Sequence, residues 1–248
     1  MLLDLSPLQL AWIGVSIFAA YVIRGMSGFG AGLIAAPMLA FVLPVHVLVP
    51  TTGLLVFLLF VVLTIRDRQQ VVWRQLKLLA LPTLAGVACG VLLFRVLDNQ
   101  LLVILLGSFL IIYSIYMIAV DAFGLPEFSF SERWAFPLGF TGAFIDTLFG
   151  GGGGALVVIY MHARKLGRPE FRATLAMLWF IEMSARIGAY AVEGYYTREV
   201  LLLVAMLIPI MWLATWVGER VGNRVSPATF SRILAVLLLL SGVSLILK

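Results

Sequence analysis

The chain has 248 residues, of which 62% are hydrophobic and only 12% charged, about half the charge of an ordinary soluble domain. Apolar runs such as 101–120 hold the roughly 20 residues that an α-helix needs to cross a hydrocarbon core of about 30 Å. These values exclude an ordinary soluble enzyme, and the continuous runs differ from the alternating strands of a membrane β-barrel. The sequence therefore predicts an all-α polytopic membrane protein of the cell membrane.

The charge and cysteine content exclude several further classes of protein. The net charge of +5 comes from basic residues in short connections between apolar segments, which membrane topology explains, so no nucleic acid partner is expected. The single Cys89 excludes a disulfide framework and a thiolate metal site, and His46 and His162 have no ligand cluster around them. No phosphate-binding loop is present. We expect no metal, no cofactor and no ATP hydrolysis.

The apolar segments repeat in length along the chain. They fall at 8–43, 48–65, 76–97, 101–120, 134–163, 171–192, 199–217 and 229–247. In each half, one over-long segment is followed by three of ordinary length, and an offset of 122 residues places Gly28, Gly30 and Gly32 on Gly150, Gly152 and Gly154. This pattern predicts a duplication, with a first membrane repeat at 1–125 and a second at 126–248.

Each over-long segment contains a glycine-dense core, at 25–32 in the first and at 150–154 in the second. As one helix, residues 8–43 would be about 54 Å long, far more than the bilayer needs. The helix is therefore expected to break at the glycines. Neither arm, 8–24 or 33–43, would be long enough to cross comfortably, so we expect a helical hairpin with its glycine turn inside the protein.

The placement of Lys and Arg distinguishes a hairpin from a single crossing. With single crossings, the two sides of the membrane carry 7 and 8 basic residues; with hairpins they carry 12 and 3. The larger set is Arg66, Arg68, Arg74, Lys77, Arg133, Arg164, Lys165, Arg168, Arg172, Arg220, Arg224 and Arg232. Only the hairpin arrangement satisfies the positive-inside rule. It predicts both termini outside the cytoplasm and two inverted halves, an architecture that recurs in secondary transporters.

The glycine cores are candidate anion sites. Backbone N–H groups at the helix starts near Ala31 and Ala155, together with the helix dipole, suit a negatively charged ligand. The candidate residues are Gly28, Phe29, Gly30, Gly32, Gly151, Gly152 and Gly153. The alternative is that these glycines only permit close helix packing, the role expected of Gly86-xxx-Gly90 and Gly218-xxx-Gly222.

Charged residues within the apolar segments are costly and therefore candidates for function. Arg24 lies beside the first glycine core, and Asp146 occupies the equivalent position of the second half. The two could form a structural pair, or a substrate anion could take the place of Asp146. Glu182 and Arg186, at i, i+4 spacing, could neutralise each other; alternatively, Arg186 is a second anion contact and Glu182, like Asp146, a proton carrier.

Three stretches, 24–37, 150–157 and 171–174, resemble the TauE/SafE family of membrane permeases. They contain the glycine-rich RGMSGFGAGLIAAP and GGGGGALV motifs and the four residues Phe171-Arg-Ala-Thr174. The resemblance implies export or uptake of sulfite, sulfoacetate or related sulfonates. It also adds Arg172 and Thr174 to the residues expected near the substrate path.

These features favour a secondary permease for a small oxyanion, sulfite or a short organosulfonate, that works by alternating access, with proton coupling left open. One alternative is a proton-linked carrier of a different solute, in which Asp146 and Glu182 titrate. Another is a non-transporting membrane scaffold subunit, although embedded charges are costly in a passive anchor. No nucleophile and base at usable spacing suggest an enzyme. The expected partners are a small anion and the lipid bilayer, and a homo-oligomer is left open.

Overall fold

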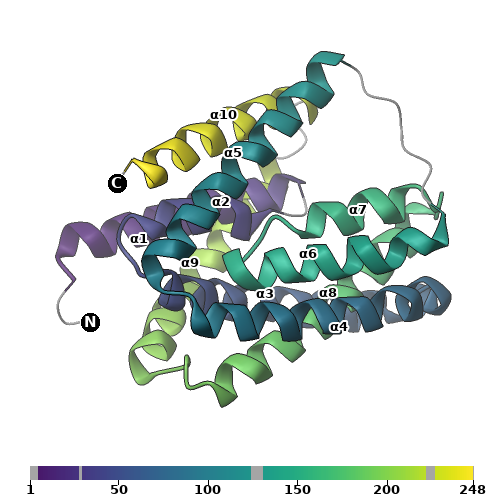
Figure 1. Cartoon of the computed structure of the whole chain (residues 1–248), viewed down its shortest axis with the longest axis horizontal. Helices are drawn as coiled ribbons and strands as arrows, with labels where there is room; N and C mark the ends of the chain where they lie inside the picture. Colours follow the sequence, from purple (N-terminus) through teal and green to yellow (C-terminus); the bar gives the residue numbers. More distant parts are fainter. Residues whose placement is uncertain (1–4, 28–29, 124–130, 222–226, 248) are drawn as a thin grey trace. The chain divides into compact units, whose positions relative to one another are not determined.

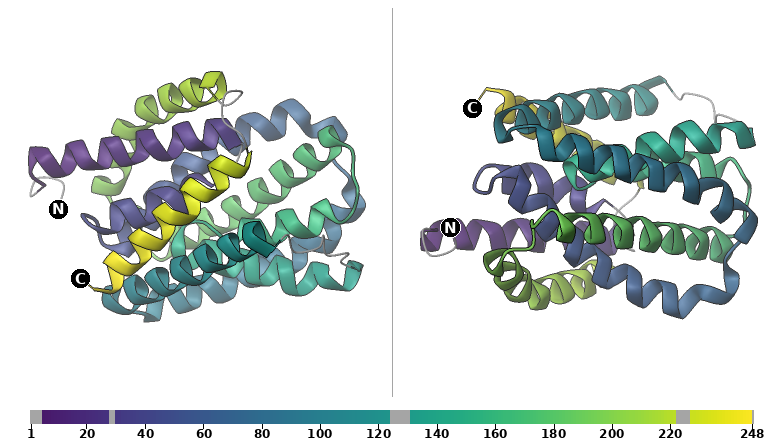
Figure 2. Two further views of the ribbon diagram at one scale, coloured as in Figure 1. Left: turned by 90° about the horizontal axis from the view of Figure 1, so that it is seen from above. Right: turned by 60° about the horizontal axis from the view of Figure 1, so that its bottom comes forward.

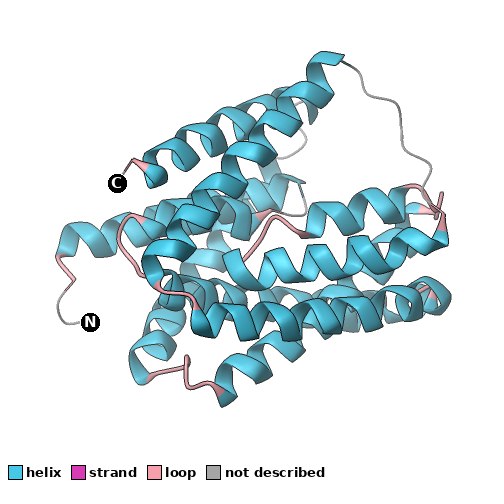
Figure 3. Ribbon diagram, in the orientation of Figure 1, coloured by secondary structure: helices cyan, strands magenta, loops and turns pink. Residues whose placement is uncertain are grey.

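The computed structural model describes residues 5–27, 30–123, 131–221 and 227–247, and within these ranges the chain is helical with no strand (Figure 3). The helices are α1 (Pro7–Ser27), α2 (Ala31–Ala40), α3 (Val45–Asp67), α4 (Trp73–Val96), α5 (Asn99–Phe123), α6 (Ala135–Phe149), α7 (Gly154–His162), α8 (Arg168–Val192), α9 (Arg198–Val221) and α10 (Pro227–Ile246), with short 3-10 helices η2 (Arg68–Gln70) and η3 (Glu132–Trp134). Within the described ranges, six helices are long and apolar enough to cross a membrane. The predicted class, a multi-pass helical membrane protein, is confirmed.

Each over-long segment is divided into two helices at its glycine core. In the first, Gly30 has a φ of 88°, and in the second, Gly150 has a φ of 79°, a left-handed conformation that favours glycine. The indole Nε1 of Trp12 donates to the carbonyl of Met38 at 2.8 Å, which ties the start of α1 to the end of α2. We call α1 with α2 hairpin 1, and α6 with α7 hairpin 2.

The first arm of hairpin 1 is longer than expected. Helix α1 has 21 residues and a length of about 31 Å, so it can cross the membrane by itself, contrary to the expectation for residues 8–24. The helix continues through Gly25, and this glycine lets α1 approach α9 closely: an added Cβ would lie 2.9 Å from the Cα of Gly218 on α9. Helix α6, with 15 residues and about 22 Å, stays short of a crossing.

The chain forms two compact units. Unit 1 consists of Met1–Leu48, Leu97–Pro126 and Arg198–Lys248, and unit 2 of Val49–Val96 and Glu127–Thr197. In unit 1, α1 packs against α9, and α5 lies beside α10 (Figures 1 and 2). The hydroxyl of Ser114 on α5 donates to the carbonyl of Ala235 on α10 at 2.5 Å, and Gly107 faces Gly242. Close backbone approach, typical of membrane helices, holds this unit together.

In unit 2, α4 packs along α6 through glycines. A Cβ added to Gly86 would collide with the carbonyl of Phe140, and one added to Gly90 would lie 2.7 Å from Thr147. The packing role predicted for Gly86 and Gly90 is confirmed, as it is for Gly218 against α1, whereas Gly222 lies outside the described residues. The buried apolar core of unit 2 comprises Val71, Leu76, Leu79, Ala135, Val157, Tyr160, Met161, Ala173, Leu175 and Leu178.

Ion pairs join three connections at one end of unit 2. Arg172 of α8 lies 2.8 Å from Asp67 at the end of α3, and Glu132 of η3 lies 2.8 Å from Arg74 and 3.9 Å from Arg164. The α3–α4 and α7–α8 connections therefore lie at the same end. If each over-long segment made a single crossing, these connections would lie on opposite sides of the membrane, so the contacts favour the hairpin arrangement.

Candidate functional site

Asp146 links the two helices of hairpin 2. It lies in the last turn of α6 with only 5% of its surface exposed, and its Oδ1 accepts a hydrogen bond from the N–H of Gly153 at 2.8 Å. The N–H of Gly154, the first residue of α7, also bonds to this carboxylate. The carboxylate thus complements the unpaired amides and the positive dipole end of α7. The anion that this helix start holds is the chain's own side chain.

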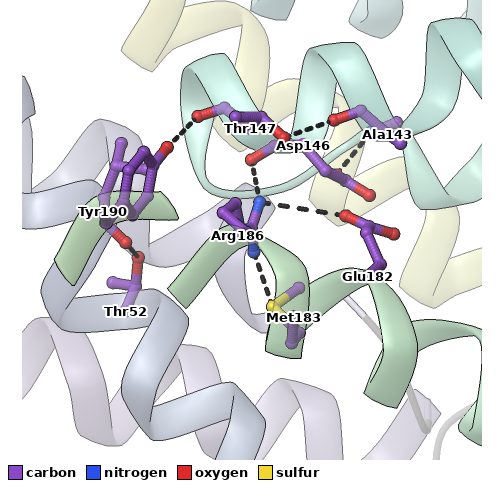
Figure 4. Close-up of polar contacts among 10 residues, drawn as sticks. Thr52, Ala143, Asp146, Thr147, Glu182, Met183, Arg186 and Tyr190 are labelled. Atoms are coloured by element: carbon purple, nitrogen blue, oxygen red, sulfur yellow. Dashed lines mark hydrogen bonds and ion pairs between the residues drawn. The ribbon is translucent and has the colours of Figure 1, made fainter. Parts of the chain in front are cut away.

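Two side chains of α8 donate hydrogen bonds to the last carbonyl groups of α6 (Figure 4). The carbonyl of Asp146 accepts hydrogen bonds from the N–H of Gly150 and from Nη1 of Arg186, and the carbonyl of Thr147 accepts one from the hydroxyl of Tyr190 at 2.5 Å. The last carbonyls of a helix have no partner within the helix, and inside a membrane water does not replace it. Arg186 and Tyr190 therefore satisfy carbonyl groups that α6 leaves unpaired at its buried end.

Glu182 is the third charged residue at this position. Its Oε1 lies 3.9 Å from Nη1 of Arg186, and its carboxylate interacts electrostatically with Asp146. Nη2 of Arg186 lies 2.7 Å from the sulfur of Met183. Both Glu182 and Arg186 are almost fully buried, with 2% and 1% exposed. We call Asp146, Glu182 and Arg186 the buried charge cluster; it contains two acids and one base.

Hairpin 1 has a basic residue where hairpin 2 has this acid. Arg24, in the last turn of α1, is 6% exposed and interacts electrostatically with Tyr21 and with Glu219 of α9. The start of α2 is buried, and among the described residues no side chain accepts a hydrogen bond from the N–H groups of Ala31, Gly32 or Leu33. Gly28 and Phe29, two of the predicted site residues, lie outside the described residues.

The predicted pair of Arg24 and Asp146 joins residues of different units, and it stays a prediction. Of the glycines predicted in hairpin 2, Gly153 donates to Asp146, and Gly151 and Gly152 lie in the turn between α6 and α7.

Arg172 and Thr174 lie away from the buried charge cluster, near the first turns of α8. Arg172 pairs with Asp67, and the hydroxyl of the buried Thr174 accepts a hydrogen bond from the N–H of Val72 at 2.9 Å. Ten residues of helix, or about 15 Å, separate Arg172 from Glu182. The contacts of these two residues fasten α8 to the α3–α4 connection.

Sequence reasoning missed Tyr190 and Asp67. Tyr190 follows Glu182 and Arg186 at the same four-residue spacing, which places all three on one face of α8 and could have indicated it. Asp67 is 105 positions from Arg172 in the sequence, and no local pattern signals their contact.

Comparison with known proteins assigns the family. Residues 13–245 match the family model described as sulfite exporter TauE/SafE. The chain belongs to the TauE/SafE family. A relative from Cupriavidus necator, named as a probable sulfite/organosulfonate exporter TauE, is 29% identical over 183 residues, which are 72% of this chain and 70% of the relative. No solved structure matches. The resemblance found in the sequence is confirmed, and the chain is a membrane transporter by family.

Proposed function

We propose that this protein is a secondary transporter for a small oxyanion, sulfite or a short organosulfonate, that works by alternating access. The name of the Cupriavidus necator relative supports this substrate class. The chain has no phosphate-binding loop for ATP, so we expect an ion gradient, substrate exchange or a separate subunit to drive the movement.

The contrast between the two hairpins carries the proposal. In hairpin 2, a glycine-bordered helix start holds a carboxylate through the N–H groups of Gly153 and Gly154. In hairpin 1, the start of α2 has the same glycine border but receives no such carboxylate within the described residues, and the buried Arg24 belongs to the same hairpin. A soluble oxyanion would complement this cation and these amides. We therefore place the substrate at hairpin 1, with Arg24, Gly28, Phe29, Gly30 and Gly32 as its contacts.

The proposed alternating access is between inverted halves 1–125 and 126–248. In unit 1, α1 of the first half packs on α9 of the second, and in unit 2, α6 of the second half packs on α4 of the first. Exchanging the halves converts one pairing into the other, which supports the duplication. The excess of basic residues on one side supports a cytoplasmic location for the α3–α4 and α7–α8 connections, with both termini outside.

Flux of labelled sulfite and of a short sulfonate into proteoliposomes tests this function. We expect saturable flux in the wild type and at least a tenfold loss in Arg24→Gln, because the variant keeps a polar side chain of similar length but no charge. Arg95→Gln is the matched control, since Arg95 is exposed and paired with Glu193 in unit 2. Sulfur oxyanions are excluded as substrates if folded wild-type protein gives no flux. Equal flux in both variants would move the site away from hairpin 1.

Proton coupling is the second part of the proposal, because the buried charge cluster holds more acid than base. We expect a pH gradient alone to accelerate sulfite flux in the same vesicles. A pH-driven flux without selectivity for oxyanions would instead favour a proton-linked carrier of another solute.

A further inference from the structure

The buried charge cluster cannot carry all of its formal charges at low cost. The guanidinium of Arg186 is always protonated in proteins, whereas Asp146 and Glu182 can each be neutral or negative. With both acids ionised, the cluster would hold a net charge of −1 with no more than 5% of any of its residues exposed. An uncompensated charge is costly in the hydrocarbon region of a membrane, because neither water nor a counterion stabilises it there.

No second cation compensates the cluster among the described residues of unit 2. Asp67 is the other buried charged residue there, and it is paired with Arg172. Helix α3 has no charged side chain between Val49 and Ile65. Apart from Tyr160 and the exposed Cys89 in the middle of α4, the charged or titratable residues of α4 and α7 are exposed and lie near the helix ends: Arg74, Lys77, Arg95 and His162.

The tyrosines near the cluster do not change this balance. Tyr190 on α8 is a phenol that donates its hydrogen to Thr147, and Tyr160 on α7 hydrogen-bonds with Gln75. Burial raises the pKa of Tyr196, which lies just beyond α8, so its hydroxyl also stays neutral near pH 7. The charge must therefore be balanced within the cluster by a proton on one of the two acids.

The surroundings of the two acids differ in a way that assigns this proton. Asp146 accepts hydrogen bonds from the N–H groups of Gly153 and Gly154 at the positive end of α7, and both features stabilise a carboxylate. Oε1 of Glu182 has no hydrogen-bond partner among the described residues and lies 3.9 Å from Arg186. We propose that Glu182 holds one exchangeable proton, while Asp146 stays ionised as the fixed counterion of Arg186.

The proposed proton exchange is balanced. A Glu182 carboxylate takes one proton from water on one side of the membrane and becomes a neutral acid, and the cluster changes from a net charge of −1 to zero. The reverse step releases that proton to the other side. The coupling of this exchange to transport rests on the proposed function, and it predicts one proton per transport cycle.

Infrared spectroscopy of the purified protein in lipid tests the proton site without any transport. We expect the carbonyl stretch of a protonated carboxylic acid at neutral pH in the wild type, a shift of this band when the protein is labelled with 13C-glutamate but not with 13C-aspartate, and its loss in Glu182→Gln. Glu193→Gln, at the exposed pair with Arg95, is the matched control and should change nothing. Glu182→Gln resembles the proposed neutral acid, so we expect its melting temperature to equal that of the wild type. A band that persists in Glu182→Gln overturns the assignment.

Flux measurements test the coupling. We expect Glu182→Gln to retain sulfite exchange within twofold of the wild type but to lose the acceleration by a pH gradient. An unchanged response to the gradient overturns the coupling. If the wild type carries no sulfite at all, the proposed function fails, and the infrared result alone decides whether Glu182 holds the proton.

Discussion

Hairpin 1 and hairpin 2 occupy corresponding positions in the sequence, but their glycine turns are supported differently. In hairpin 2, a short α6 ends at Gly150, and Asp146 joins its last turn to the start of α7. In hairpin 1, α1 is six residues longer than α6, runs through Gly25, and carries Arg24 in its last turn. Both hairpins use glycines for close packing, Gly25 against α9 and Gly142 against Gly153, but among the described residues only the second is closed by its own carboxylate.

This difference teaches that a glycine-rich motif does not by itself define an anion site. The same motif can be filled internally, as in hairpin 2, or left for a ligand, as we propose for hairpin 1. The charge on the neighbouring residue, Asp146 or Arg24, distinguishes the two cases.

The largest effect is expected from alanine at the tightest glycine. A Cβ at Gly153 would collide with the carbonyl of Gly142, whereas at Gly30 it would meet no atom of the described residues within 4 Å and would only strain the left-handed backbone. Gly153→Ala should destabilise the protein by about 3 kcal/mol, the upper range for overpacking, and Gly30→Ala by about 1–2 kcal/mol. Thermal unfolding in detergent measures both, with Gly188→Ala as the control in open space. Equal losses of stability in Gly153→Ala and Gly30→Ala would contradict the conclusion that the turn of hairpin 2 is the more tightly packed of the two.

A smaller effect is expected from removing the carboxylate that closes hairpin 2. Asp146→Ala leaves the buried N–H of Gly153 without its acceptor, which should cost about 1–3 kcal/mol, and Asp146→Asn should cost less because its amide oxygen still accepts. The same unfolding experiment measures this. Asp98→Ala, which removes an exposed cap at Leu101, provides the comparison and should cost about 1 kcal/mol. If alanine and asparagine were equivalent at position 146, the bond to Gly153 would have no role in stability.

The smallest effect on stability is expected at the end of hairpin 1 that lies opposite its glycine turn. Trp12→Phe removes the hydrogen bond to the carbonyl of Met38 but keeps an aromatic ring, so we expect a loss of about 0.5–1 kcal/mol. Trp73→Phe, at an exposed tryptophan of α4, is the control and should leave the melting temperature unchanged. An unchanged melting temperature in Trp12→Phe would mean that this hydrogen bond does not stabilise the contact between α1 and α2.

The sequence was sufficient to predict the long helices, because each is an apolar run with polar ends. It did not predict that α1 continues through Gly25, which packs against Gly218, a residue of α9 far along the chain. The bond between Asp146 and Gly153 crosses a turn whose geometry the sequence does not specify. The contacts of Arg172 and Thr174 join α8 to residues about 100 positions earlier, so only the resemblance brought these two residues to attention.

The packing of α1 against α9 has a consequence for biosynthesis. Every segment of unit 2 lies between Val49 and Thr197, so the ribosome completes this unit before α9 begins at Arg198. At about 5–20 residues per second, α1 waits roughly 10–40 s in the translocation machinery or the lipid before its partner is made. During that time Glu219 has not yet been made and cannot interact with Arg24. The insertion machinery must therefore keep this cation out of the hydrocarbon region until the fold buries it.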